Sequence, residues 1–469
     1  MVPGSRRKAA TVLVPPGAVT VTTMSSTDGS PELTYPAEGW GGFIREHLGP
    51  SLMWALLGIG GSHIVLAPTL GGLYGLFGVW IVAVVYLAKY GGWELGIQYN
   101  YGIGRNPVEG YGDLPGPDHW GQWLTLAVYL VGWTVILAAV GFTSATFAAA
   151  LVPGFTPIQL YVILIGIAMA LTLVSRYSWL ENLMKIFVIA LGGLIVLGVF
   201  VAPPSPSVVS EKVFTVPDVT APGFLGLFAA IAGYAPTGLS TTVTIGSWSL
   251  AKKQGARALR SKDLDPRDEQ YHEYIRAWMA VGKRDFRIAF GFSFVLLVSM
   301  IFLATAVLYP TPPKDQNVAL AIGNLLQESF GPWSFYAIVV GAFAALYSTV
   351  ITVMDGAARV NADVLPLVLE RDMDTDRLRR GFIVVMGLAS LVPILVIGQL
   401  PVTLVIFSAA LMAILQVFFY IANYYIVREH LPDPFQPTTL QRAYYAITIV
   451  LVVAFGVMGA MGRLGLVGG

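Results

Sequence analysis

Long apolar runs alternate with short polar segments along the chain from residue 48 onward. Each run has about 20 or more residues, which at 1.5 Å per residue lets a helix cross a hydrocarbon core of about 30 Å. Lipid admits only helices and closed barrels, and these runs are too long for barrel strands of about ten residues. The pattern therefore predicts an all-α polytopic membrane protein with eleven spans, at about 48–70, 73–99, 120–150, 156–175, 180–202, 222–248, 286–309, 333–364, 380–398, 401–427 and 442–463.

The composition agrees with this class, since 55% of the residues are hydrophobic and 12% are charged, against about 25% charged in soluble proteins. A net charge of +1 leaves no basic surplus for a nucleic-acid partner. The chain has no cysteine, which excludes disulfides, thiolate metal sites and a cysteine nucleophile. We see no nucleophile constellation or phosphate-binding loop, and we predict no enzyme activity and no cofactor.

Basic residues set the expected orientation. With the N-terminus in the cytoplasm, 22 of the 28 Lys and Arg residues fall in cytoplasmic segments, whereas Lys212, Lys314 and Arg463 lie outside. We therefore expect a multi-pass protein of a prokaryotic plasma membrane with a disordered cytoplasmic tail over 1–40 and a transporter domain over 41–469. The segment 271–279 is typical of a short amphipathic helix at the membrane surface or of a solvated connector.

Two spans carry backbone breakers at mid-depth. Pro50 opens the first span and Gly61 follows eleven residues later, and Pro222 and Gly233 repeat this spacing in the sixth span. Five spans separate the two patterns, which predicts two inverted five-helix repeats whose discontinuous helices meet near the bilayer centre. The unwound carbonyls and amides there can bind a solute or an ion. A bulky residue at Gly61 or Gly233 is expected to fill the space between the two helices.

Several motifs in the spans resemble those of the Nramp divalent-metal transporters. The similarity runs from Leu48-Gly49-Pro50 through Gly71-Gly72-Leu73-Tyr74-Gly75 and continues at Gly104-Arg105-Asn106-Pro107. It is looser at Glu181, at 348–352 and at Gln416. The resemblance implies a LeuT-type fold with an eleventh helix after the two repeats, and secondary transport by alternating access.

The chain departs from the Nramp pattern where that family binds its metal. The family's Asp-Pro-Gly-Asn falls on Gly60-Gly61-Ser62-His63, so the aspartate is Gly60 and the asparagine is His63. Its Met-Pro-His-Asn falls on Ala235-Pro236-Thr237-Gly238. Of the family's ligands, the carbonyl of Ala232 alone can be carried over. The third span has no charged residue between Trp120 and Val152, so the family's proton-relay residues are missing as well.

A transition-metal site needs carboxylate, imidazole or sulfur ligands, which these positions do not supply. His63 is interpreted as a hydrogen-bonded histidine lining a solute cavity rather than as a ligand, and we predict no metal site. Trp133, Tyr234 and Trp248 can also line a cavity or simply pack. The candidate substrate-binding residues are Gly60, Gly61, Ser62, His63, Ala232, Gly233, Tyr234, Ala235, Thr237 and Gln416.

Charged residues inside spans are costly and usually paired or functional. Asp355 and Arg359 lie four residues apart on one helical face and can pair, either as a structural ion pair or with a gating or coupling role. Glu94 either contacts substrate or couples transport, or is solvated near the cytoplasmic end. Glu181 and Lys185 are interpreted as an interfacial pair.

We therefore expect an Nramp-related secondary transporter that moves a small solute or a weakly coordinated cation. Two half-helix N-termini favour a zwitterion or anion, whereas Glu94 and Asp355 favour an organic cation, and the sequence does not choose between them. A divalent-metal transporter (Mn, Fe or Mg) with unrecognised ligands is an alternative, and a solute-binding membrane sensor is an alternative of another class. The expected partners are the small-molecule or ion substrate and the lipid bilayer, and the sequence leaves the oligomeric state open.

Overall fold

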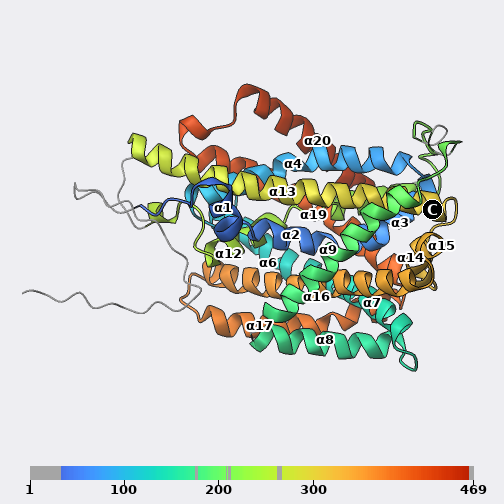
Figure 1. Cartoon of the computed structure of the whole chain (residues 1–469). Coiled ribbons are helices and arrows are strands. Elements are labelled where there is room, and N and C mark those ends of the chain that lie inside the picture. The colour runs from blue at the N-terminus through green and yellow to red at the C-terminus, as the bar shows by residue number, and fades with distance from the viewer. Residues whose placement is uncertain (1–32, 175–177, 208, 210–212, 261–266, 464–469) are drawn as a thin grey trace, which may run out of the picture.

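The computed structural model describes residues 33–174, 178–207, 209, 213–260 and 267–463, and this part of the chain is helical without a β-strand (Figure 1). The predicted tail over 1–40 lies outside the described residues up to residue 32. From there on, Leu33 is buried, and the ring of Tyr35 packs on Tyr274 with centroids 5.3 Å apart. These residues contact the helical bundle.

Apart from α20, the long helices form two inverted five-helix repeats of the LeuT-type fold. The first repeat contains α2 (Pro50–Gly58), η2 (Ser62–Leu66), α3 (Ala67–Tyr74), α4 (Phe77–Ile103), α6 (Trp120–Ala127), η4 (Val128–Gly132), α7 (Trp133–Leu151), α8 (Pro157–Val174) and α9 (Ser178–Val201). The second contains α11 (Phe224–Tyr234), α12 (Thr241–Ala251), α13 (Glu269–Leu308), α16 (Trp333–Leu369), α17 (Thr375–Ala389), α18 (Leu391–Ile397) and α19 (Pro401–His430). The eleventh helix is α20 (Thr439–Arg463).

Short helical segments connect the long ones. They are α1 (Gly39–Gly42), η1 (Phe43–His47), α5 (Pro107–Gly110), η3 (Tyr111–Asp113), η5 (Arg257–Arg260), α14 (Val318–Gly323), η6 (Asn324–Leu326), α15 (Gln327–Phe330) and η7 (Asp433–Phe435). The segment 271–279 is not a separate surface helix or a connector, because it forms the first turns of α13. Its apolar side chains Tyr274, Ile275 and Trp278 are buried against the bundle, which explains why the helix continues.

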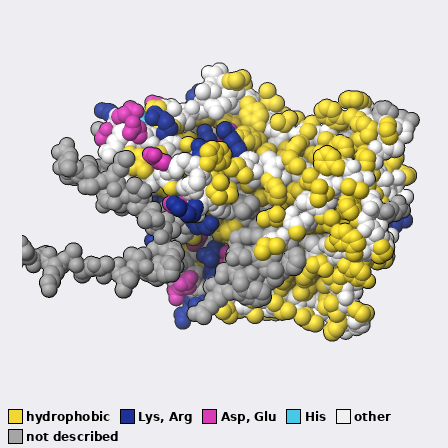
Figure 2. Space-filling view, viewed as in Figure 1, with side chains coloured by type: hydrophobic (Ala, Val, Ile, Leu, Met, Phe, Trp, Pro, Cys, Tyr) yellow, Lys and Arg dark blue, Asp and Glu magenta, His cyan; other side chains and the backbone are white. Residues whose placement is uncertain are grey.

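Seven stretches of the described chain are long and apolar enough to cross a membrane by length and composition. The first and sixth spans do not qualify as single helices because both are interrupted, and α4 carries Lys89 and Glu94 within its length. Figure 2 shows hydrophobic side chains over most of the visible face and charged side chains gathered at one end, where α13 begins and α12 ends. This distribution is the one expected of a polytopic protein with a single strongly charged face.

Both predicted breaks are present. Helix α2 ends at Gly58, and the chain turns through Ile59 and Gly60 before η2 begins at Ser62. Helix α11 ends at Tyr234, and residues 235–240 separate it from α12, with a cis peptide bond between Ala235 and Pro236. The two halves of the first span both pack on α13, whereas α11 packs on α19 and α20, and α12 packs on α16 and α4.

Candidate functional site

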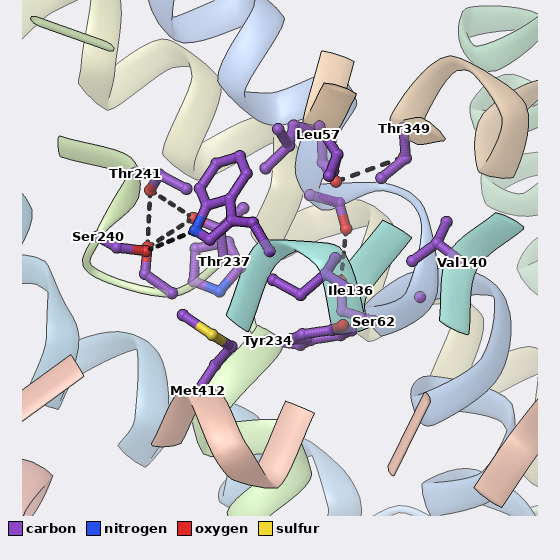
Figure 3. Close-up of a pocket in the computed structure, with 16 residues that line it drawn as sticks. Leu57, Ser62, Ile136, Val140, Tyr234, Thr237, Ser240, Thr241, Thr349 and Met412 are labelled. Atoms are coloured by element: carbon purple, nitrogen blue, oxygen red, sulfur yellow. Dashed lines mark hydrogen bonds between the residues drawn. The ribbon is translucent and has the colours of Figure 1, made fainter. Parts of the chain in front are cut away.

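A small cavity lies between the two breaks, closed by α7, α16 and α19 (Figure 3). Its free volume is small, about 40 Å³, which is room for a few waters. Its lining residues carry no charge: Leu57, Gly58, Gly61, Ser62, Trp133, Ile136, Val140, Tyr234, Pro236, Thr237, Gly238, Ser240, Thr241, Thr349, Val353 and Met412. The cavity in this conformation suits a small occupant.

Part of the predicted site lines this cavity. Gly61, Ser62, Tyr234 and Thr237 do so, as does Trp133. The other predicted residues are buried close by without lining it, namely Gly60, His63, Ala232, Gly233, Ala235 and Gln416, and Trp248 packs elsewhere in α12. The sequence therefore located the two breaks, but it did not tell which side chains at each break face the cavity.

His63 is not among the residues that line the cavity. Its Nε2 lies 2.9 Å from the Ser293 carbonyl oxygen in α13, and its Nδ1 lies 3.0 Å from the Gly58 carbonyl oxygen and 2.8 Å from Ser62 Oγ. Both ring nitrogens are thus engaged, and the side chain is 2% exposed. The ring is hydrogen-bonded as predicted, but it does not line this cavity.

Hydroxyl groups from the second break form the polar wall of the cavity. Thr237 Oγ1 and Thr241 Oγ1 lie 3.0 Å apart, and Trp54 Nε1 donates to both, at 2.7 and 3.1 Å. Trp93 Nε1 adds a second indole donor to Thr241 at 3.2 Å, and Trp133 Nε1 lies 3.3 Å from Ser240 Oγ. These donors fix the hydroxyl oxygens as acceptors and leave their hydrogens for carbonyls, for each other or for a solute.

Glycines at the breaks permit close contacts of different kinds. A Cβ at Gly61 would lie 3.0 Å from the Tyr234 ring, on the cavity side. A Cβ at Gly60 would meet Thr349 Oγ1 at 2.5 Å. A Cβ at Gly233 would lie 1.8 Å from the Ala409 carbonyl oxygen in α19. Gly233 therefore serves helix packing, and the expectation that it faces the space between the broken helices is wrong.

The carbonyls of the second break surround the buried side-chain amine of Lys89. Lys89 Nζ donates to the carbonyl oxygens of Ala232 and Thr237, each at 2.6 Å, and lies 3.0 Å from that of Ala235 and 3.3 Å from that of Gly233. Gln416 Nε2 also donates to the Ala232 carbonyl, at 3.1 Å. The Ala232 carbonyl and the amide nitrogen of Gln416 are thus engaged in hydrogen bonds within the chain.

The family of this fold follows from comparison with known proteins. The family model described as "Natural resistance-associated macrophage protein-like" matches residues 79–461. The chain belongs to the Nramp family. The matched segment begins after the first broken span and includes the second. An uncharacterized protein from Pasteurella multocida strain Pm70 is 26% identical over 337 residues, which cover 69% of this chain and 71% of that protein.

Solved structures support the same fold. The manganese transporter of Eremococcus coleocola, in complex with an aromatic bis-isothiourea compound, superimposes with a TM-score of 0.68 at 13% identity, covering 92% of this chain and 90% of that chain. MhsT in complex with L-phenylalanine gives a TM-score of 0.51 at 13% identity, covering 88% and 98%. At these identities the similarity shows the fold alone. The resemblance to Nramp transporters and their LeuT-type fold is confirmed.

The predicted Asp355–Arg359 pair is present and has a third member. Arg359 Nε lies 2.8 Å from Asp355 Oδ2, and Arg379 Nη2 of α17 lies 2.7 Å from Asp355 Oδ1. Arg379 also donates to the Thr172 carbonyl at the end of α8. The Asp355 side chain is 3% exposed. Its contact with Arg379, which in turn donates to Thr172, joins α16, α17 and α8. In this Nramp protein the network does not line the cavity between the breaks, whereas Arg359 lines a separate cavity with Glu109 and Asp363.

Glu94 also lies away from the cavity. Its carboxylate is 3.5 Å from Arg287 Nη2 of α13 and accepts from the hydroxyl of Tyr445 in α20 at 3.2 Å. It joins α4, α13 and α20, and it is not among the residues that line the cavity. The side chains of Glu181 and Lys185 lie outside the described residues.

The contacts of three buried charged side chains were missed from sequence. Lys89 lies within the second predicted span, where a lysine in the middle of an apolar run was itself a signal. Arg379 lies directly before the ninth predicted span. Asp285 was placed just outside the seventh span, yet its carboxylate accepts from the backbone amides of Ser51 at 2.9 Å and Gly49 at 3.3 Å, at the N-terminus of α2. Its partners are far away in sequence, which hides this cap.

Proposed function

We propose that this Nramp protein transports a small solute, or a weakly coordinated cation, through the cavity between its two broken spans, and that it has no transition-metal site there. The observation that carries this proposal is the uncharged wall of the cavity. Transport rather than catalysis follows from the family, and the two discontinuous spans are the elements around which alternating access would occur.

The chemistry of the wall argues against a dehydrated divalent ion. Two positive charges in a low-dielectric site need anionic or strongly donating ligands. The described wall supplies neutral hydroxyls and one thioether, that of Met412. The described residues contain no group of three or more His, Cys, Asp or Glu side chains placed to hold a metal. The carbonyl of Ala232, which the family resemblance implies as a ligand, already accepts from Lys89 and Gln416.

The hydroxyl groups of the wall, whose oxygens accept hydrogen bonds from indole N–H groups, suit a polar organic solute instead. Thr237, Thr241 and Ser62 offer short-range hydrogen bonds, while Ile136, Val140 and Val353 offer apolar contact. A pocket of this kind orients a ligand with a few polar contacts and gains most of its free energy from apolar burial. The small free volume of the cavity in this conformation favours a small solute.

Ligand-dependent thermal stability of the purified full chain tests the proposal. A ligand at 100 times its dissociation constant stabilises the native state by about 2.7 kcal/mol, so a panel of small zwitterions, carboxylates, amines and polar neutral compounds, with Mn²⁺ and Mg²⁺, should show an increase in Tm with one organic class. Gly61→Leu, which projects into the cavity, should abolish the shift. Gly166→Leu is the matched control, because no atom lies within 4 Å of its Cβ position.

The opposite pattern would refute the proposal. An increase in Tm with Mn²⁺ at micromolar concentration that Gly61→Leu removes and Gly166→Leu retains would establish a metal substrate bound by other ligands. Uptake of the stabilising solute into liposomes, absent for Gly61→Leu, separates a transporter from a sensor that binds without moving its ligand.

The orientation and the division into a tail over 1–40 and a transporter domain over 41–469 are part of the same proposal. The charged end of the molecule is proposed to face the cytoplasm, because Lys and Arg gather there (Figure 2). Since the chain has no cysteine, Lys253→Cys and Lys314→Cys can be labelled individually in intact cells. An impermeant thiol reagent should label residue 314 and not residue 253, and the reverse result would invert the topology.

A further inference from the structure

The second break contains a site that is built like a cation-binding site and is occupied by a side chain. The Lys89 ammonium is 0% exposed, and it lies within 3.3 Å of four carbonyl oxygens from residues 232, 233, 235 and 237. An ammonium has three N–H donors, so four carbonyls cannot each receive a hydrogen bond of their own. The carbonyls surround the charge as ligands surround an ion.

The surroundings of the ammonium supply its compensation without an anion. No described carboxylate lies within 4.0 Å of Nζ. The C-terminal end of α11, which carries partial negative charge, points its last carbonyls at it, and the face of the Trp93 ring lies 5.0 Å away. A buried charge is tolerated only when such groups replace its hydration. The four carbonyls are therefore preorganised for a monovalent cation of small size.

We propose that Lys89 is a tethered cation that fills a monovalent-cation site at the broken sixth span, so that this half-helix end is held without any dissociable ion. The proposal deepens the proposed function on which it rests, because a permanently filled carbonyl site leaves the neighbouring cavity to the solute. Lys89 is thus a positioning residue that sets the ion requirement of the protein.

Chemical rescue tests this inference on the full chain in detergent. Lys89→Ala removes three methylenes beyond Cβ together with the ammonium, and n-propylammonium replaces this group. In choline chloride we expect the Tm of Lys89→Ala to lie well below that of the unmodified protein. About 100 mM n-propylammonium should restore at least half of this loss and should shift the unmodified protein by less than one-tenth of it. Tetramethylammonium and n-propanol should restore nothing, since one cannot donate hydrogen bonds and the other has no charge.

A second pair of variants covers the case in which Lys89→Ala does not fold. Lys89→Arg keeps the charge and Lys89→Met keeps the stem without it. We expect folded protein with Lys89→Arg and a large loss of Tm with Lys89→Met. Lys283→Ala is the matched control, a half-buried lysine of α13, and n-propylammonium should not change its Tm selectively.

Equal stability of Lys89→Met and the unmodified protein would overturn the proposal, because the stem alone would then suffice. Equal responses to n-propylammonium in all variants would overturn it too. These readings need no substrate, so their failure leaves the solute proposal intact. Conversely, a manganese substrate found in the ligand panel would refute the solute proposal while leaving the rescue result standing.

Discussion

The two broken spans occupy corresponding places in the two repeats, yet they satisfy their unwound carbonyls in different ways. In the first break, the Gly58 carbonyl accepts from the hydroxyl of Ser62 and faces the imidazole of His63, both from the next turn of the same span. In the second break, the carbonyls of Ala232, Ala235 and others accept from the ammonium of Lys89 on α4. One break relies on neutral local donors and the other on a distant charge.

This difference shows which of the two breaks is built around a charged group. A helix C-terminus is stabilised more by a cation than by a neutral donor, and the longer unwound segment, over 235–240, exposes more carbonyls to be satisfied. The first break is short, and its unwound carbonyl accepts from donors of the same span. This break therefore contributes mainly to the shape of the cavity. The second contributes both the hydroxyl wall and the carbonyl cage.

The largest expected effect comes from the glycines of the two breaks. Gly233→Ala places a Cβ 1.8 Å from the Ala409 carbonyl, which no rotamer can relieve, and we expect loss of folded protein because α11 must leave α19. Gly61→Ala meets the Tyr234 ring at 3.0 Å, which can shift by a few tenths of an ångström, so it should fold. Size-exclusion profiles and Tm measure both. Gly233→Ala as stable as the control Gly166→Ala would contradict this packing.

The second-largest effect is expected at Asp355. This residue lies on α16, which packs against α2 and α12, the halves of the two broken spans that lie toward the charged end of the molecule. Asp355→Ala leaves two guanidinium groups around an empty position and should cost about 3–5 kcal/mol in the free energy of unfolding. The double variant with Arg359→Ala should remain destabilised, since Arg379 also loses its carboxylate contact. Replacing all three with leucine should recover part of the loss. Denaturant titration distinguishes these cases, and full recovery in the double variant would remove Arg379 from the network.

His63→Ala tests the contrast between the neutral donors of the first break and the charged donor of the second break. It leaves the carbonyls of Gly58 and Ser293 with fewer partners and should cost about 1–3 kcal/mol in stability, less than Lys89→Met. Thr69→Ala is the matched control, because Thr69 is a buried, hydrogen-bonded side chain of the first span that does not line the cavity. Thermal unfolding measures the cost. Loss of solute binding in His63→Ala, with binding retained in Thr69→Ala, would show that His63 belongs to the substrate site.

The smallest effect concerns the ends of the half-helices. Asp285→Asn weakens the carboxylate cap on the amides of Gly49 and Ser51 and should cost about 1 kcal/mol. Asp315→Asn, which alters a similar cap on Val402 and Thr403 at the start of α19, is the control outside the broken spans. Both should lower the denaturant midpoint by similar amounts, and only Asp285→Asn should change solute binding. A change of binding in both would indicate a global effect.

Hydrophobic periodicity and paired breakers were sufficient to predict the all-helical fold, its two repeats and the place of both interruptions, because these properties are local or repeat along the chain. The Asp355–Arg359 contact was also accessible, since four residues on a helix lie on one face. The partners of His63, Lys89 and Asp285 could not be predicted in the same way. Each contacts a segment more than 140 residues away in sequence, and the direction of a side chain around a broken helix depends on how that segment packs.

Helix α13 runs beside the first span on both sides of its break. Its Asp285 holds the start of α2, its Ser293 carbonyl accepts from His63, and its outer part packs on α3. Helix α13 thus holds both halves of the first span, and we expect the first span and α13 to move together as one rigid unit. The two halves of the sixth span share α4 as a neighbour, but α11 packs mainly on α19 and α20, whereas α12 packs on α16. We therefore expect the 235–240 segment to be the flexible joint of the proposed transport cycle. Amide hydrogen exchange should be faster there than around Gly60.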